Sequence, residues 1–276
     1  MFRRAIVRQP GRNFGEGLTT VSLGQPDYPR AISQHDAYCT ALERCGLTLT
    51  RLKPDEGYPD STFVEDTAVL VDQCDGKGIT QQRAILTRPG AVSRTGEVAD
   101  MRNVLGQFFA ELHCILEPGT LDGGDICQAG NHFFIGISER TNEAGAQPLA
   151  ELLTLFGNTS SFIEIQSPNK ESLSTASASP GILHLKSGLA YLGDNRLVII
   201  ESLAHREEFR HFDLICVDPA EEYAANCVRI NDYVLVAAGF RELEKKLRDL
   251  GYKTIALDMT EFQKMDGGLS CLSLRF

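Results

Sequence analysis

The sequence lacks any apolar run long enough to cross a membrane. Its longest apolar stretch, near residues 234–240, is interrupted by Gly239 and falls well short of the roughly 18 residues that a membrane helix needs. The N-terminal segment MFRRAIVRQPGR is basic, but no apolar segment follows it, so we expect no signal peptide. These features predict a soluble, cytoplasmic protein.

Basic residues are in the minority. The chain has 27 Lys and Arg against 37 Asp and Glu, which gives a net charge of −10 over 276 residues. Such a surface is poorly suited to a nucleic-acid backbone or an anionic membrane, so we expect neither as a partner. A cationic small molecule fits the charge better, and the sequence leaves a homodimer open.

A metal-binding cysteine pattern is also missing. The chain has eight cysteines, no two of which form a C-x-x-C motif. In a cytoplasmic chain of this length we expect reduced thiols that are mostly small buried hydrophobic residues. The spacing of His113-Cys114 and of Cys127 with His132 is irregular for zinc, so we expect no metal and no other cofactor.

Five segments have apolar residues at the three- and four-residue spacing of an amphipathic helix. They are residues 30–45, 100–112, 145–156, 203–209 and 241–250. A short β-rich segment follows each of them, at residues 47–52, 114–116, 162–165, 214–217 and 254–257. Gly46, Gly157 and Gly251 stand where a helix often ends in a residue with positive φ.

Pairs of apolar runs split by turn residues precede the second to fifth helices and predict β-hairpins. Their turns lie near Asp75-Gly76, Gly130-Asn131, Asp194-Asn195 and Asn231-Asp232. The first helix lacks such a hairpin, unless the C-terminal CLSLRF pairs with the N-terminal FRRAIV. That pairing would give five repeated units of about 55 residues each.

The repeats predict an α/β fold: a five-fold pseudo-symmetric α/β propeller of five ββαβ units in a ring. Residues 1–276 would form a single catalytic domain whose fifth unit is shared between the two termini. A generic α/β sandwich is the alternative, whereas a TIM barrel fits poorly because it needs parallel neighbours and not hairpins.

Polar residues cluster where the first strand of each unit begins. In a closed ring these strand starts would converge and bring together Asp66, Asp122, His184, Asn226 and Cys271. Cysteine with histidine and carboxylates is a set suited to covalent catalysis, and paired carboxylates suit a planar guanidinium. Taken singly, Asp122 could be a turn residue, His184 a core histidine and Cys271 a structural thiol.

Several motifs resemble those of the dimethylarginine dimethylaminohydrolase family, in the guanidino-modifying (pentein) superfamily. They are FVED, LTRPGA, LDGGD, FFIGISERTN, LHLKSGLAYL, AANC and DGGLSCLSLRF, in that order along nearly the whole chain. The resemblance implies a five-fold propeller. It also implies a hydrolase that converts N-omega-methylated L-arginines to L-citrulline and methylamine or dimethylamine through a covalent cysteine thiouronium, without a cofactor.

The same resemblance implies a role for each residue of the site. Cys271 would be the nucleophile, His184 the general acid and then the base, and Asp122 the residue that orients the histidine or the substrate. Asp60 would bind the substrate ammonium, Arg94 and Arg140 its carboxylate, and Asp66 its guanidinium. The full predicted substrate-binding set is Leu18, Asp60, Glu65, Asp66, Arg94, Arg140 and Asp266, with Leu18 on a lid.

Two other functions stay open at this point. One is a hydrolase for arginine itself or a related guanidino compound, because a hydrophobic pocket discriminates a methylene by only about 1–3 kcal/mol. The other is a non-catalytic protein of the same architecture, such as a ribosome anti-association factor.

Overall fold

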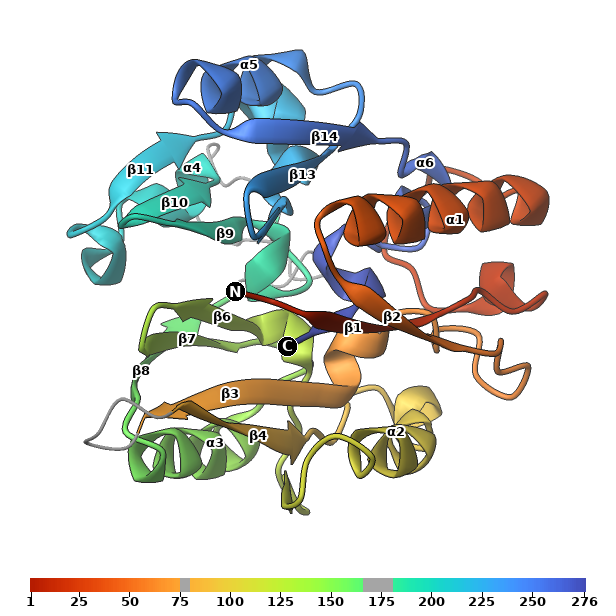
Figure 1. The fold of residues 1–276 in the computed structure, drawn as a ribbon, viewed down its shortest axis with the longest axis vertical. Coiled ribbons are helices and arrows are strands. Elements are labelled where there is room, and N and C mark those ends of the chain that lie inside the picture. Colours follow the sequence, from red (N-terminus) through yellow and green to blue (C-terminus); the bar gives the residue numbers. More distant parts are fainter. Residues whose placement is uncertain (75–79, 166–180) are drawn as a thin grey trace, which may run out of the picture.

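The computed structural model describes residues 1–74, 80–165 and 181–276, which form five three-stranded sheets around a common centre (Figure 1). The first two sheets contain β15 (Leu274–Arg275), β1 (Arg4–Arg8) and β2 (Thr48–Leu52), and β3 (Ala68–Cys74), β4 (Thr80–Leu86) and β5 (Leu112–Cys114). The third contains β6 (Ile126–Ala129), β7 (His132–Ile137) and β8 (Thr159–Glu164). The last two contain β9 (Leu189–Gly193), β10 (Arg196–Ile199) and β11 (Asp213–Cys216), and β12 (Val228–Ile230), β13 (Tyr233–Ala237) and β14 (Lys253–Leu257).

All five sheets have the same internal pattern. The inner strand runs antiparallel to the middle strand, and the middle strand runs parallel to the outer one. The inner strands β15, β3, β6, β9 and β12 face the centre, where β6 contacts β9 and β9 contacts β12. This repetition, together with the structural comparisons reported below, confirms the predicted five-fold propeller.

The two ends of the chain complete one sheet. β1 pairs with β15 antiparallel, with Ala5 opposite Arg275 and Ile6 opposite Leu274. The pairing of FRRAIV with CLSLRF is therefore confirmed, and Figure 1 shows both termini beside this sheet. Its consequence is that Cys271 stands just before the inner strand of this sheet, as a site residue does in the other units.

A helix connects the middle strand to the outer strand in each unit, as a parallel pair requires. These helices are α1 (Tyr28–Arg44), α2 (Glu97–Leu105), α3 (Glu143–Leu155), α4 (Glu201–Ala204) and α5 (Arg241–Asp249), and a short α6 (Thr260–Gln263) follows β14. The side chains of Asp27 and Asn142 cap α1 and α3 by accepting hydrogen bonds from backbone N–H groups. The predicted glycines at 46, 157 and 251 all have positive φ.

Two predicted helices differ from the structure. The segment 203–209 is not one helix, because Arg206 is extended (φ −75°, ψ 140°) and separates α4 from a short 3₁₀ turn at Glu207–Phe209. The helix predicted over residues 100–112 begins earlier, at Glu97, and ends at Leu105, after which the chain turns into β5. At the predicted hairpin turns, Asp194, Asn195 and Asn231 have the positive φ that tight hairpin turns require, whereas the predicted turn at 75–76 lies outside the described residues.

The polar clusters at the strand starts form 3₁₀ turns that precede the inner strands. They span Val64–Thr67, Gly123–Asp125, Leu185–Ser187, Pro219–Ala225 and Ser270–Leu272. Successive turns pack against one another around the centre of the ring. Residues that lie 40 or more positions apart in sequence are thereby brought together at one end of the central axis.

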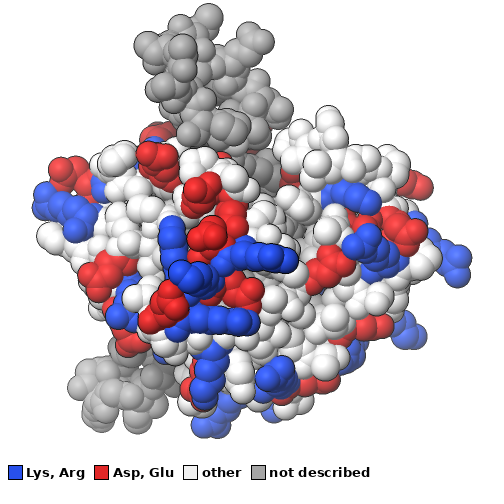
Figure 2. Space-filling model, turned by 90° about the horizontal axis from the view of Figure 1, so that it is seen from above, with Lys and Arg blue, Asp and Glu red and all other residues white. Residues whose placement is uncertain are grey.

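Apolar side chains fill the space between the sheets and the helices, and the charged residues lie outside apart from a small buried set. On the face shown in Figure 2, acidic and basic side chains are intermingled. On α5, which lies at the top of Figure 1, Arg248 pairs with Glu244 at 2.6 Å and Lys245 with Asp249 at 3.7 Å. No helix in the described part of the chain is both long and apolar enough to span a membrane.

Candidate active site

One pocket collects all the predicted site residues except Glu65. Its lining includes Leu18, Asp60, Asp66, Arg94, Asp122, Arg140, His184, Asp266 and Cys271. It also includes four residues that the sequence analysis did not single out, namely Phe63, Leu183, Met265 and Gly267. These four adjoin motif residues, and their backbone and apolar surfaces shape the pocket between the charged groups.

His184 and Asp122 form a buried acid–imidazole pair. Nε2 of His184 lies 3.0 Å from Oδ2 of Asp122, and Oδ1 of Asp122 accepts a hydrogen bond from the Gly90 N–H at 2.8 Å. Burial alone would lower the pKa of His184, but the carboxylates of Asp66, Asp125 and Asp122 outweigh it and raise this pKa to about 9. The imidazole is therefore a protonated acid at neutral pH.

Asp66 is held from two sides. Its Oδ1 accepts a hydrogen bond from the Gly124 N–H at 2.8 Å, and its Oδ2 lies 2.6 Å from Nη1 of Arg94. Although burial opposes the charged form, His184 and Arg94 lower the pKa of Asp66 to about 2. The pocket thus presents a permanent carboxylate beside the imidazole.

Glu97 is a functional neighbour that the sequence analysis missed. It is buried in the first turn of α2 and pairs with Arg94 at 2.8 Å. Burial raises the pKa of Glu97 to about 7, even though Arg94 opposes the shift. Its position three residues after Arg94 at a helix start was the available signal, because such pairs face each other on a helix.

Cys271 lies in the 3₁₀ turn at Ser270–Leu272, where its Sγ is 3.4 Å from the Gly268 nitrogen. Burial, reinforced by the charges of Glu65 and Asp66, raises the pKa of the Cys271 thiol to about 12. In the free protein this group is a neutral thiol. A bound cation next to the sulfur would favour the thiolate, which is the reactive form.

The segment around Leu18 is hydrogen-bonded to two acids that line the pocket. The Leu18 N–H donates to both carboxylate oxygens of Asp60, at 3.1 and 3.2 Å. Asp266 accepts hydrogen bonds from the backbone and side chain of Thr20, the former at 2.5 Å. Leu18 lines the pocket and is 41% exposed, and its place on a lid stays a prediction.

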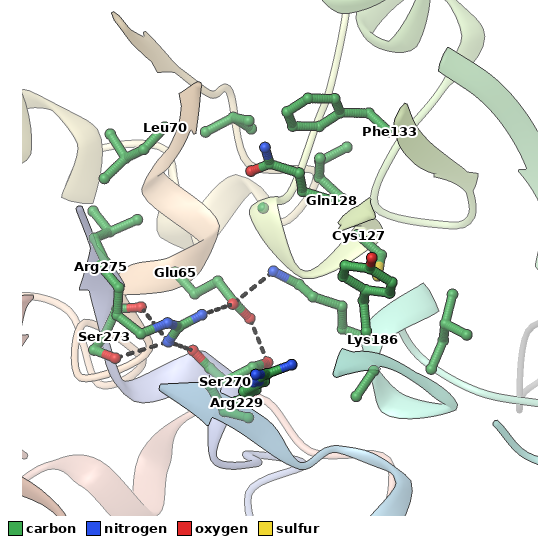
Figure 3. Close-up of a pocket in the computed structure, with 18 of the residues that line it drawn as sticks. Glu65, Leu70, Cys127, Gln128, Phe133, Lys186, Arg229, Ser270, Ser273 and Arg275 are labelled. Carbon is green, nitrogen blue, oxygen red and sulfur yellow. Dashed lines mark hydrogen bonds and ion pairs between the residues drawn. The ribbon is translucent and has the colours of Figure 1, made fainter. Parts of the chain in front are cut away.

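Glu65 is the exception among the predicted site residues, because it points away from this pocket. Its carboxylate lies 2.6 Å from Nζ of Lys186, accepts a 2.7 Å hydrogen bond from Oγ of Ser270 and lies 3.4 Å from Arg275 (Figure 3). Adjacent residues here face opposite sides, so Asp66 faces the pocket while Glu65 supports it from behind. The expected lining role of Glu65 is therefore corrected.

Asn226 likewise supports the site from outside the pocket. Its amide nitrogen donates to the Lys186 carbonyl at 2.8 Å and to Oγ of Ser270 at 3.0 Å, and its oxygen accepts from the Ser270 N–H at 2.9 Å. These bonds fix the turn that carries Cys271. Asn226 was predicted to lie near the centre, and the structure places it against the turn that carries Cys271.

Asp125 is a second buried carboxylate that the sequence analysis left without a role. It accepts hydrogen bonds from the hydroxyls of Ser138 and Thr141, both at 2.7 Å, and from the Leu185 N–H at 3.0 Å. The last bond holds the residue that follows His184. Asp125 therefore helps to orient the imidazole, and the paired acids of the LDGGD motif were the signal.

Asp66, Asp122 and His184 are close enough to ligate a metal ion, since one atom of each lies within 4.8 Å of the others. Their donor atoms are already engaged, however. Asp66 accepts from Arg94 and Gly124, and Asp122 accepts from Gly90 and lies against His184. An organic cation that donates hydrogen bonds in a plane fits this arrangement of partly used carboxylates.

Gly124 is required for the packing of the site. A Cβ atom at this position would lie 2.8 Å from Cγ and Nδ1 of His184 and 3.0 Å from Oδ1 of Asp66. We expect Gly124→Ala to displace the imidazole and to lower kcat/KM by roughly 100-fold, the effect of an ångström-scale misplacement. The measurement is steady-state kinetics with circular dichroism as a check on folding.

The matched control is Gly106→Ala, at the exposed end of α2, where a new Cβ would meet the Arg102 carbonyl oxygen at 3.3 Å. This variant should keep near-normal kinetics. Full activity in Gly124→Ala would contradict the close packing of the imidazole.

The raised pKa of His184 predicts a pH-dependent contribution to stability. Because the folded value is about 9 and the ordinary value 6.5, the charged imidazole stabilises the folded state fully below pH 6.5. This stabilisation should decline as the pH rises from 6.5 to about 9. We expect the difference in unfolding free energy between wild type and His184→Gln to shrink over that range in urea titrations, and a constant difference would contradict the assignment.

Comparisons with known proteins agree with this fold and site. A family model described as arginine deiminase matches residues 103–226. An N(G),N(G)-dimethylarginine dimethylaminohydrolase from Pseudomonas aeruginosa is 40% identical over 277 residues, covering 100% of both chains. The structure of the enzyme from that organism, as a cysteine-to-serine variant with citrulline, has 39% identity and a TM-score of 0.89 over 100% of both chains.

A second structure of a dimethylarginine dimethylaminohydrolase is a histidine-to-glycine variant captured as an adduct with S-methyl-L-thiocitrulline. It covers 100% of both chains with 39% identity and a TM-score of 0.88. The fold and the cysteine–histidine–acid site define a propeller hydrolase of the class that acts on C–N bonds of amidines. Within this class the chain belongs to the dimethylarginine dimethylaminohydrolase family, which confirms the resemblance of its motifs.

Proposed function

We propose that this protein hydrolyses N-omega-methylated L-arginines, asymmetric dimethylarginine and monomethylarginine, to L-citrulline and dimethylamine or methylamine. One observation carries the proposal. Cys271, His184, Asp122 and Asp66 line one pocket, with the imidazole paired to Asp122 at 3.0 Å. A non-catalytic binder has no need for such a set, and full-length relatives with this name support the enzyme.

The first half of the reaction forms the covalent intermediate. The cationic guanidinium binds between the carboxylates of Asp66 and Asp122 and favours loss of the proton from Cys271. The thiolate forms a C–S bond to the guanidinium carbon, and the tetrahedral adduct collapses as the bond from that carbon to the methylated nitrogen breaks. His184, protonated at neutral pH, gives its proton to the departing amine.

The second half releases citrulline. The neutral His184 takes a proton from a water molecule, whose oxygen bonds to the thiouronium carbon. The C–S bond then breaks and restores Cys271. Asp122 keeps the imidazole in place through both proton transfers, and Asp125 fixes the backbone beside it.

The remaining polar residues of the pocket suit the amino-acid end of the substrate. We assign the α-ammonium to Asp60 and the α-carboxylate to Arg140 and Arg94, with Leu18 and Asp266 at the entrance. In the free protein Arg94 pairs with Asp66, so its guanidinium takes part in holding the acid that receives the substrate. Three expectations from the sequence stay predictions. They are a cytoplasmic location, one catalytic domain over residues 1–276, and the option of a homodimer.

The test is a citrulline assay with asymmetric dimethylarginine, monomethylarginine and arginine as separate substrates. We expect kcat/KM for the methylated substrates to exceed that for arginine by at least about tenfold, the discrimination that one or two methyl contacts supply. Arginine hydrolysis is the second candidate, since the arginine deiminase model matches residues 103–226. Citrulline from arginine alone would select it, and no citrulline from any of the three would overturn both.

A further inference from the structure

A second cavity lies on the axis of the ring and is called here the axial cavity (Figure 3). Its volume is about 180 Å³, and its walls come from the inner strands β3, β6, β9, β12 and β15. Glu65 and Ser270 line it, whereas their neighbours Asp66 and Cys271 line the candidate active site. The axial cavity is therefore a separate compartment that adjoins the back of that site.

Positive charge exceeds negative charge around the axial cavity. Lys186, Arg229 and Arg275 line it, and Glu65 is the one carboxylate among its described lining residues. Glu65 is shared by Lys186 at 2.6 Å and Arg275 at 3.4 Å, and these two cations have only 17% and 14% of their side chains exposed. Buried positive charge that nearby negative charge does not balance is unfavourable. An anion bound in the axial cavity would therefore be stabilised.

Arg229 stands at the rim of the axial cavity. Its side chain is 34% exposed and pairs with Asp194 at 3.1 Å. Asp194 lies outside the cavity lining, so this carboxylate offsets Arg229 from the solvent side. An anion that enters beside Arg229 would meet a cation first and then the deeper pair of Lys186 and Arg275.

The rest of the lining is mixed, with Gln128, Tyr191, Ser270 and Ser273 beside the apolar residues. Leu70, Phe133 and Leu189 contribute side chains to the wall. An apolar cavity of roughly 150 Å³ is large enough to hold a benzene ring. The axial cavity therefore suits a ligand that has a small apolar body and a single negative group.

We propose that the axial cavity is a binding site for a small organic monocarboxylate with an apolar body. The carboxylate pairs with Lys186 and Arg275, and the body lies against Leu70 and Phe133. This site is distinct from the one proposed for methylated arginine, and it does not depend on that function.

Sodium benzoate is a suitable probe, and the test is calorimetric titration of the full-length protein. Saturable binding of one benzoate per chain is expected. Benzamide has the same ring without the charge, and it should bind at least about tenfold more weakly because charge-assisted hydrogen bonds are lost. Equal binding of benzamide would overturn the assignment of an anion site.

Variants in the cavity wall locate the bound probe. Ala190→Leu adds volume to the lining and should abolish binding, and Arg229→Gln should weaken it about fivefold, as loss of a partly exposed charge does. Lys245→Gln on α5 removes the same charge from a 73% exposed side chain and should leave binding unchanged. The proposal pairs the carboxylate with Lys186, so unchanged binding in a folded Lys186→Gln or Ala190→Leu protein would overturn it. If neither of these variants folds, unchanged binding in Arg229→Gln would overturn it, because this cation belongs to the same lining.

A competition experiment separates the axial cavity from the pocket of Arg94 and Arg140, which could also hold a carboxylate. Benzoate binding should persist in the presence of saturating citrulline, because the two cavities have different linings. Displacement of benzoate by citrulline would place the probe in the candidate active site and overturn the proposal. If citrulline does not bind, the cavity variants still show which of the two cavities holds benzoate.

Discussion

Replacement of Cys271 by serine is expected to lower citrulline formation by at least about 1,000-fold, because the hydroxyl of serine is a far weaker nucleophile than a thiolate. The neighbouring structure gives serine no substitute activation. His184 is already protonated at neutral pH, with a pKa of about 9, and so cannot act as a base toward the hydroxyl. The reaction would stop before the covalent intermediate forms.

The fold should survive this substitution, since serine and cysteine have similar volumes and the turn at Ser270–Leu272 is held by Asn226. The measurement is citrulline production from asymmetric dimethylarginine together with thermal unfolding of the variant. Cys216→Ser is the matched control, because Cys216 is exposed on β11 and should be dispensable. Near-normal turnover in Cys271→Ser would remove Cys271 as the nucleophile.

The order of elements was predictable because two strong local signals recur: four of the five units contain a hairpin, and three of the connecting helices end at a glycine. Gly46, Gly157 and Gly251 have the positive φ that their positions indicated. The terminal pairing of β1 with β15 followed from counting units, since a ring leaves no unpaired inner strand. The prediction of one helix over residues 203–209 was wrong, because the apolar spacing continues through Arg206, where the backbone is extended.

The sequence predicted which positions lie near the site, but it did not predict which way each side chain points. The starts of the inner strands converge, so the sequence located Asp66, His184 and Cys271 near one another. Which of two adjacent residues faces the pocket depends on the geometry of a 3₁₀ turn, and a sequence pattern does not contain it. Glu65 was therefore assigned to the pocket, whereas it faces Lys186 in the axial cavity.

The sequence also did not reveal the residues that support the site by holding another residue in place. Glu97 is adjacent to no catalytic motif residue, yet it shares Arg94 with Asp66. Asp125 contacts Thr141 and the backbone of Leu185 and thereby supports His184 without touching the pocket. Such roles depend on contacts between units of the ring, which form only when the chain has folded.

His184→Ala is expected to lower turnover of asymmetric dimethylarginine by at least about 100-fold, and to separate the two halves of the reaction. Without the imidazole, a departing amine receives no proton and water is not activated. A substrate with a leaving group that needs no proton should still complete the first half. S-methyl-L-thiocitrulline is such a compound, because it releases methanethiolate.

We therefore expect the His184→Ala protein to accumulate an adduct on Cys271 when it is treated with S-methyl-L-thiocitrulline, and intact mass spectrometry would detect it. The related enzyme with a histidine-to-glycine change has been captured as an adduct with this compound, which supports the choice of probe. Asymmetric dimethylarginine should give much less adduct in the same time, because its amine leaves only after protonation. His205→Ala, at an exposed position, should turn over both compounds normally.

The comparison of the two substrates tests whether His184 serves both proton transfers. If the imidazole serves both proton transfers, the adduct forms from the thiol-leaving compound and persists, since Asp66 cannot take its place. Asp66 has a pKa of about 2 and holds its charge against Arg94, which makes it too weak a base to activate water. Rapid decay of the adduct in His184→Ala would assign water activation to another group, and absence of any adduct would refute the covalent route through Cys271.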